Sequence, residues 1–240
     1  MPGSPPLVAV TFDYWNTLCR ADPAATLARR KQSWHKVARE RSLDVEVEVL
    51  DSVLEHVSAL HHEGWITNVQ FTAEHAIDAA TVLLDSVLGE GDADALRDAW
   101  FDASRRADVQ LTPHCETVVA TLAARGVRLG IVCDVGLTPS VLLRGFLESH
   151  GVLQHFSHWS FSDEVGVYKP RREIFDHALA GLGSSAAEAL HIGDIRRTDV
   201  AGARAAGMRA VRYCGVADDD DPTIEDAPLV IDDLRLLLEL

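Results

Sequence analysis

The sequence predicts an α/β protein in which a doubly wound parallel sheet is split, after its first strand, by a helical insert. Three observations support this fold class. Residues 7–12 form a short apolar run, residues 23–106 carry a helical pattern, and strand-like and helix-like segments alternate after Pro113. Such alternation is typical of a parallel sheet with helices on both faces.

The first strand is predicted at residues 7–12, which read LVAVTF. A continuous apolar run rich in β-branched residues is typical of a strand buried on both faces of a sheet. The run ends at Asp13. We therefore expect this carboxylate at the carboxyl end of a buried strand.

Four helices are predicted in the insert from their apolar spacing and their end signals. The first begins at Asp22 and Pro23, the second ends at Gly64, the third ends at Gly89, and the fourth covers 92–106. Residues 45–49 alternate like a strand, but they lead straight into the second helical pattern, which favours helix.

After Pro113 the pattern predicts the remaining core elements. Helices are expected at 114–126, 140–151, 171–183 and 199–208, and strands at 127–134, 157–162, 189–194, 209–214 and 228–231. We expect residues 1–20 and 110–240 to form the α/β core, and residues 21–109 to form a helical domain. Ligands of such sheets bind at the carboxyl ends of the strands. The acidic run 217–222 is expected to be a solvated loop.

Composition narrows the functional classes. The chain has 240 residues, 47% hydrophobic residues and a formal net charge of −15. It can bury a full core, and its charge argues against nucleic-acid binding. No apolar run reaches the ~20 residues that a membrane helix needs, and the start MPGSPP lacks signal-peptide features. The four cysteines are scattered, as in reduced thiols. These features predict a cytoplasmic protein with no membrane partner.

Chemically capable residues follow the predicted strands in a fixed order. A single aspartate at a strand end is often only a helix cap, but several at neighbouring strand ends indicate a site. The residues are Asp13 in TFDYWNTL, Cys133 and Asp134 after LGIV, Lys169 in GVYKPRREIF, and Asp194 and Asp199 in HIGDIRRTDVAGARAAGM.

These motifs resemble those of the haloacid dehalogenase (HAD) superfamily. The family has an apolar strand followed by DxDxT, a second strand ending in Ser or Thr, a Lys often followed by Pro, and GD followed by another Asp. The resemblance covers residues 7–20 and about 111–235. The insert matches the position of the family's helical cap, which implies a Rossmann-like core with a cap that could act as a lid.

The resemblance implies a role for each matching residue. Asp13 would be the covalent nucleophile, and Lys169 would stabilise the transition state. Mg²⁺, which prefers oxygen ligands, would be held by Asp13, the carbonyl of Trp15, Asp194 and Asp199. The substrate phosphate would meet the backbone amides of 14–17 and the side chains at Thr17, Cys133 and Asp134.

The chain departs from the family pattern at its first two motifs. Phosphatases of the family place a second Asp two residues after the nucleophile, where this chain has Trp15. An indole cannot relay a proton, and a positioned general acid contributes about 10²–10⁴ in rate. Cys133 replaces the usual Ser or Thr, and a thiol is a weak donor. Asp134 is either a capping residue or a substitute proton relay.

Three functions remain open from the sequence. The acidic fourth motif favours a magnesium-dependent phosphatase that acts on a small phosphorylated metabolite. An aromatic residue at position 15 resembles metal-independent dehalogenases, which need no acid for a halide. A catalytically weak member that binds a phosphorylated ligand or a partner is the third. Histidines 56, 61, 62 and 75 match no metal pattern. Arg196 and Arg197 are expected to be solvated, and the oligomeric state is not predicted.

Overall fold

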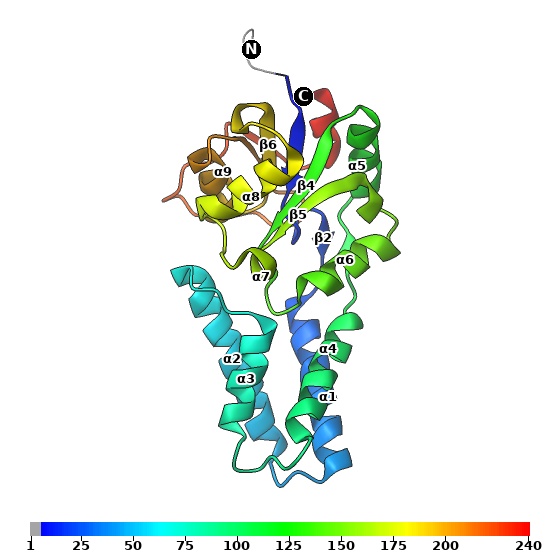
Figure 1. The fold of residues 1–240 in the computed structure, drawn as a ribbon, viewed down its shortest axis with the longest axis vertical. Helices are drawn as coiled ribbons and strands as arrows, with labels where there is room; N and C mark the ends of the chain where they lie inside the picture. Colours follow the sequence, from blue (N-terminus) through cyan, green and yellow to red (C-terminus); the bar gives the residue numbers. More distant parts are fainter. Residues whose placement is uncertain (1–5) are drawn as a thin grey trace. The chain divides into compact units, whose positions relative to one another are not determined.

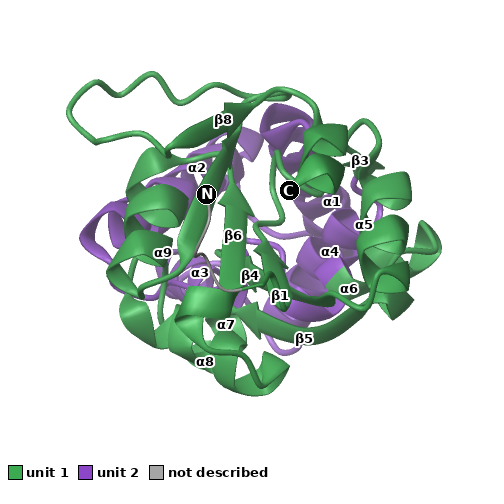
Figure 2. Ribbon diagram, turned by 90° about the horizontal axis from the view of Figure 1, so that it is seen from above, with its two compact units in different colours: residues 1–20, 109–134, 144–240 green, residues 21–108, 135–143 purple. Residues whose placement is uncertain are grey.

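The chain divides into two compact units in a computed structural model that describes residues 6–240. Among these residues, the core unit comprises 6–20, 109–134 and 144–240, and the insert unit comprises 21–108 and 135–143 (Figure 2). Residues 1–5, which hold most of the segment examined for a signal peptide, lie outside the described residues. The predicted division into an α/β core domain and a helical cap domain stays a prediction.

Six parallel strands form the main sheet of the core unit within residues 6–240, in the order β5-β4-β1-β6-β7-β8. Figure 1 labels β4, β5 and β6 of this sheet. The strands are β1 (Ala9–Phe12), β4 (Arg128–Cys133), β5 (Phe156–Phe161), β6 (Ala189–Gly193), β7 (Arg209–Tyr213) and β8 (Leu229–Ile231). Every neighbouring pair is parallel. This sheet confirms the predicted α/β fold class.

β1 lies in the middle of the sheet, and all four of its residues are buried. Phe12, its last residue, pairs with Ile131 of β4 and Ile192 of β6. Because the three strands are parallel and in register, their carboxyl ends meet at one edge. The residues that follow them, including Asp13 and Asp194, are thereby brought together.

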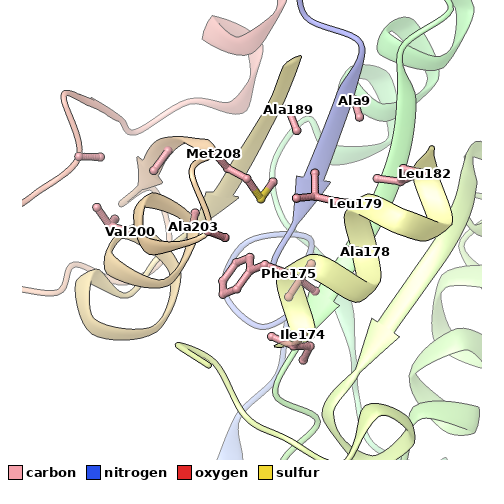
Figure 3. Close-up of a cluster of buried hydrophobic side chains, with 14 residues drawn as sticks. Ala9, Ile174, Phe175, Ala178, Leu179, Leu182, Ala189, Val200, Ala203 and Met208 are labelled. Atoms are coloured by element: carbon pink, nitrogen blue, oxygen red, sulfur yellow. The ribbon is translucent and has the colours of Figure 1, made fainter. Parts of the chain in front are cut away.

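Helices cover the sheet of the core unit. They are α5 (Cys115–Ala124), α7 (Ser162–Val165), α8 (Arg172–Leu182) and α9 (Ala201–Ala205), with η1 (Leu153–His155), η2 (Ala186–Glu188), η3 (Arg196–Val200) and η4 (Leu234–Glu239). α6 (Ser140–Ser149) begins in the insert unit and ends in the core unit. Phe175 and Leu179 of α8 pack with Ala203 and Met208 against the sheet (Figure 3), burying apolar surface that stabilises the core.

The insert unit is helical and has a hydrophobic core of its own. Its helices are α1 (Pro23–Arg41), α2 (Val47–Thr67), α3 (Ala73–Leu83) and α4 (Asp92–Arg105). Trp34 and Trp100 are fully buried in it, with ring centroids 6.1 Å apart. Asp22 caps α1 as the sequence predicts, accepting a hydrogen bond from the backbone N–H of Ala24 at 2.9 Å.

Two predicted helix ends in the insert were wrong. α2 continues past Gly64 to Thr67 and ends where Asn68 adopts the left-handed conformation. Gly64 lies within the helix, where the chain just after the helix end passes close to it. A Cβ at residue 64 would come 2.6 Å from the carbonyl oxygen of Val69, so glycine is required there. α3 ends at Leu83, before Gly89, and the chain continues in turns.

Two further features of the core differ from the sequence prediction. The sequence did not predict the antiparallel pair β2 (Cys19–Arg20) and β3 (Gln110–Leu111), which joins the chain on either side of the insert. The helix predicted at 199–208 starts earlier, as the π-helical turn η3, and continues as α9.

The acidic run is not simply solvated. Arg212 donates to Asp218 at 2.6 Å, and the Arg196 backbone N–H donates to Asp219 at 2.7 Å. Arg196 is likewise not a free surface charge, because its guanidinium lies 3.1 Å from Asp226. Within residues 6–240, no helix has the length and apolarity that crossing a bilayer requires.

Candidate active site

Asp13 stands at the carboxyl end of β1 and is 5% exposed. Its backbone N–H donates to the carbonyl of Ile192 on the neighbouring strand at 2.7 Å. A tight turn follows, in which Asn16 adopts a left-handed φ of 58° and the N–H groups of Leu18 and Cys19 both donate to the Tyr14 carbonyl. Asparagine tolerates this conformation better than most residues, so the sequence NT after the aromatic pair suits the turn.

Lys169 joins two of the predicted site residues. Its ammonium donates to the carboxylate of Asp13 and, at 2.6 Å, to Oδ1 of Asp199. All three side chains are buried. The backbone N–H of Lys169 donates to Oδ1 of Asp134 at 2.9 Å. Asp134 therefore holds the lysine segment in place, and its predicted contact with substrate stays a prediction.

The residues of the fourth motif are also held by specific donors. Asp194 accepts a hydrogen bond from the side-chain amide of Asn16 at 3.1 Å. Asp199 accepts from the backbone N–H of Ile195 at 3.0 Å and from the hydroxyl of Thr198 at 3.3 Å. These contacts link the turn after β1 to the loop after β6.

Three carboxylates converge at this edge of the sheet. Asp13, Asp194 and Asp199 each offer an oxygen, and these atoms lie within 4.8 Å of one another. Burial raises the pKa of Asp13, and burial together with Asp199 raises the pKa of Asp194 to about 7. Burial opposes ionisation of Asp199 as well, but Lys169 and His191 hold its pKa below the ordinary value. Like charges crowded in low dielectric favour protonation or a bound cation.

The charge balance of the cluster fits a divalent cation. When ionised, the three carboxylates carry three negative charges, and the Lys169 ammonium compensates one of them. Two negative charges then remain on buried oxygen atoms, the ligand type that Mg²⁺ prefers. The predicted carbonyl ligand, that of Trp15, belongs to the turn directly after Asp13.

His191 is a site residue that the sequence analysis missed. It is fully buried on β6, where Nε2 lies 3.0 Å from Oδ1 of Asp199 and Nδ1 lies 2.9 Å from the hydroxyl of Thr11. Burial lowers the pKa of His191, so the ring is neutral and carries one N–H. An ionised Asp199 can only accept, so Nε2 carries the proton and Nδ1 accepts from Thr11. His191 thus donates a hydrogen bond that holds the Asp199 carboxylate in place.

Replacing His191 by Leu should lower the free energy of unfolding by about 1–3 kcal/mol, since it removes a donor to Asp199 and leaves the Thr11 hydroxyl only its 3.5 Å contact with the Leu190 carbonyl. His191→Gln, which keeps an N–H donor, should lose less. Urea denaturation measures both, with His56→Leu on the exposed face of α2 as a control. A His191→Leu protein as stable as the parent would contradict this reading of the network.

The remaining predicted residues lie at the end of β4 and in the turn after β1. Cys133 is fully buried at the end of β4, and burial and the charge of Asp13 raise its pKa, which keeps it a thiol. Thr17 is fully buried, and its hydroxyl has no hydrogen-bond partner among residues 6–240. Trp15 is half-buried and packs edge-on against Tyr14, with ring centroids 4.9 Å apart. The catalytic and binding roles of these residues stay predictions.

A parallel α/β sheet, split after its first strand by a helical unit and carrying carboxylates at its carboxyl edge, defines the class of haloacid dehalogenase-like hydrolases. The chain belongs to this family, because the family model described as haloacid dehalogenase-like hydrolase matches residues 7–207. The family resemblance found in the motifs is therefore confirmed.

Characterised relatives include several phosphatases. The chain is 38% identical over 141 residues to a phosphoserine phosphatase from Thermus thermophilus, covering 58% of this chain and 54% of the relative. It is 34% identical over 123 residues to a ribulose-1,5-bisphosphate 5-phosphatase from Halopiger xanaduensis, covering 51% and 50%. The chain thus spans about half the length of these curated relatives.

Solved structures share the fold along nearly the whole chain. A 2-haloacid dehalogenase from Pseudomonas syringae superposes with a TM-score of 0.71 at 23% identity, covering 97% of both chains. A HAD hydrolase from Bacillus subtilis superposes with a TM-score of 0.66 at 18% identity, covering 98% of both. At these identities the likeness establishes the fold alone.

Proposed function

We propose that the protein is a magnesium-dependent phosphatase that transfers the phosphoryl group of a small metabolite to Asp13 and then to water. The observation that carries this proposal is the cluster in which Lys169 bridges Asp13 and Asp199 beside Asp194. The matches to phosphatases acting on small phosphorylated molecules support the substrate class.

Each side chain has a defined part in the proposed reaction. Asp13 would hold its carboxylate oxygen in line with the phosphorus atom and form an acyl phosphate, releasing the alkoxide or phenolate. The Lys169 ammonium would keep Asp13 ionised and stabilise charge on the phosphoryl oxygens. The unsatisfied hydroxyl of Thr17 would supply a donor to the same oxygens. Water would then attack phosphorus and break its bond to the Asp13 oxygen, which releases inorganic phosphate and regenerates the carboxylate.

A magnesium ion would be held by Asp13, the carbonyl of Trp15 and Asp194, with Asp199 in support. When bound, it would neutralise charge on the phosphoryl group. The fit rests on the two negative charges that Lys169 leaves uncompensated when all three carboxylates are ionised, and on the oxygen-only donor set of the cluster. Asp199 would also anchor Lys169, which it contacts at 2.6 Å.

Hydrolysis of an aryl phosphate tests this function, because a phenolate leaves with little need of a proton. We expect hydrolysis that requires Mg²⁺, stops on chelation with EDTA and returns when Mg²⁺ is restored. Release of halide from a 2-haloacid in the presence of EDTA would instead support a dehalogenase. Neither activity, combined with thermal stabilisation by a phosphorylated metabolite, would support a binding protein.

Trp15→Asp should accelerate hydrolysis of alkyl phosphates by about 10²-fold, since it supplies the acid that an alkoxide leaving group needs. Hydrolysis of aryl phosphates should change little. Trp15→Phe is the matched control, because it removes the indole without adding a carboxyl group. Steady-state rates on both substrate types measure the effect. Equal rates for the Asp and Phe variants on alkyl phosphates would refute this explanation of position 15.

A further inference from the structure

A cavity lies at the amino ends of the strands, at the opposite end of the sheet from the carboxylate cluster. Its volume is about 410 Å³, within the roughly 300–1,000 Å³ range of small-molecule sites. The walls come from the segment before β1, from α9 and the turn after it, from β6, β7 and β8, and from Leu240. The lining residues are Leu7, Leu190, Arg204, Met208, Arg209, Ala210, Val211, Pro228, Leu229 and Leu240.

The position of the cavity follows from the register of the sheet. Arg209 opens β7 and pairs with Leu190 of β6, while Val211 pairs with Leu229, which opens β8. Asp194, by contrast, follows the other end of β6. A strand of five residues spans roughly 16 Å, so about the length of one strand separates the two sites.

Apolar side chains form most of the wall. Leu190, Met208 and Val211 are each at most 5% exposed, and Leu229 is 37% exposed at the rim. Such a surface gains free energy when an apolar body excludes water from it. The apolar residues do not determine which class of ligand binds, but the two arginines of the lining do.

Arg209 is a cation without a counter-charge. Among residues 6–240, no carboxylate lies within ion-pair distance of it, and its buried Nε and Nη2 atoms have no hydrogen-bond partner. Arg204, the other arginine of the lining, lies 3.2 Å from Glu225 and is partly compensated. Buried N–H donors without acceptors are costly. Arg209 lines the cavity, although its Nε and Nη2 atoms are closed to solvent in this structure. If the side chain turns toward the cavity, these unused donors are suited to bind a carboxylate through two parallel hydrogen bonds.

We propose that this cavity binds a small carboxylic acid with an apolar body, its carboxylate on Arg209 and its apolar part against Leu190 and Met208. The overall charge of −15 does not oppose this, because the local field at Arg209 determines which ion enters. The site is independent of the phosphatase chemistry, so binding here is expected whether or not Asp13 acts as a nucleophile.

NMR of the methionine methyl groups tests the proposal with few signals to assign. The chain has two methionines, Met1 and Met208, and Met208 lines the cavity. With ¹³C-methyl methionine in the full-length protein, sodium octanoate should shift the Met208 signal saturably. Octanol and octylammonium should do so at least tenfold more weakly, because neither offers an anion to the guanidinium.

Variants separate a carboxylate site from unspecific apolar binding. Arg209→Gln should weaken octanoate binding at least tenfold, and Leu229→Trp should block it by filling the rim. Arg128→Gln is the matched control, since Arg128 also opens a strand at this end of the sheet but lies outside the cavity. Should Arg209→Gln fail to fold, Arg209→Lys should still bind, but less tightly than the parent.

Two results would overturn the proposal. One is a Met208 signal that does not move with octanoate at millimolar concentration. The other is equal binding of octanoate and octanol that survives Arg209→Gln, which would mean that the cavity only accommodates apolar chains. Isothermal titration calorimetry with the same panel gives a second, independent measurement of the affinity.

Discussion

Asp13→Asn should lower magnesium-dependent phosphatase activity by about 10³-fold or more, since an amide is not a nucleophile and cannot carry the acyl phosphate. The substitution preserves the shape of the side chain, which is 5% exposed at the end of β1. The loss should appear in the rate of hydrolysis of a saturating aryl phosphate, and addition of more Mg²⁺ should not restore it.

Asp176→Asn provides the matched control for that experiment. Asp176 lies on the outer face of α8, where it pairs with Arg172 at 3.0 Å, and both side chains are largely exposed. Exposed pairs of this kind contribute about 1 kcal/mol or less, so this variant should retain full activity. Asp13→Asn that keeps more than a tenth of the parent rate, with a normal melting temperature, would exclude Asp13 as the nucleophile.

Lys169→Met should affect both stability and activity. Lys169 is 2% exposed and bridges two buried carboxylates. Removing one partner from a buried ion pair typically destabilises a fold by about 3–5 kcal/mol, because the remaining charges are left uncompensated. Removing a cation that faces the transition state costs about 10²-fold or more in rate. Chemical denaturation without Mg²⁺ and steady-state kinetics with Mg²⁺ measure the two effects.

Lys31→Met makes the corresponding change at the surface. Lys31 pairs with Glu55 at 2.6 Å and with Asp51 at 3.4 Å on the insert unit, and its own side chain is 20% exposed, against 3% for that of Lys169. We expect its loss to cost about 1 kcal/mol or less. If Lys169→Met were no less stable than Lys31→Met and equally active, the buried bridge would have no role in the fold or in the reaction.

Much of the site could be predicted because it depends on strand ends. The apolar runs before Asp13 and Asp194 identify buried strands, and parallel strands in register bring their following residues together. The sequence thereby placed these carboxylates at one edge. Lys169 follows no predicted strand directly, and only the family motif identified it.

The role of His191 could not be predicted in the same way. Its partners are Thr11, which is 180 residues distant in sequence, and Asp199 on the following turn. Within the apolar segment ALHIGD a histidine gives no signal of its own, because its hydrogen bonds are tertiary. Residues whose function depends on a neighbouring strand need the sheet order before they can be recognised.

Two misassigned features also depended on tertiary contacts. Gly64 is a typical helix terminator by composition, but here it allows the chain at Val69 to pass closely over α2. The aspartates of the run 217–222 have the composition of a solvated loop, yet Asp218 accepts from Arg212 at 2.6 Å and Asp219 accepts from the Arg196 backbone N–H at 2.7 Å. Contacts of this kind between distant segments cannot be predicted from the local sequence.

Direct trapping of the phosphorylated aspartate would test the proposed chemistry most directly. The tryptic peptide 1–20 contains Asp13 as its only side-chain carboxyl group. Borohydride reduces an acyl phosphate to an alcohol, so protein quenched during turnover should yield this peptide with one oxygen replaced by two hydrogens at position 13. We expect that product only when Mg²⁺ and an aryl phosphate are both present. An enzyme that turns over while peptide 1–20 stays unmodified under the same quench would contradict a covalent intermediate on Asp13.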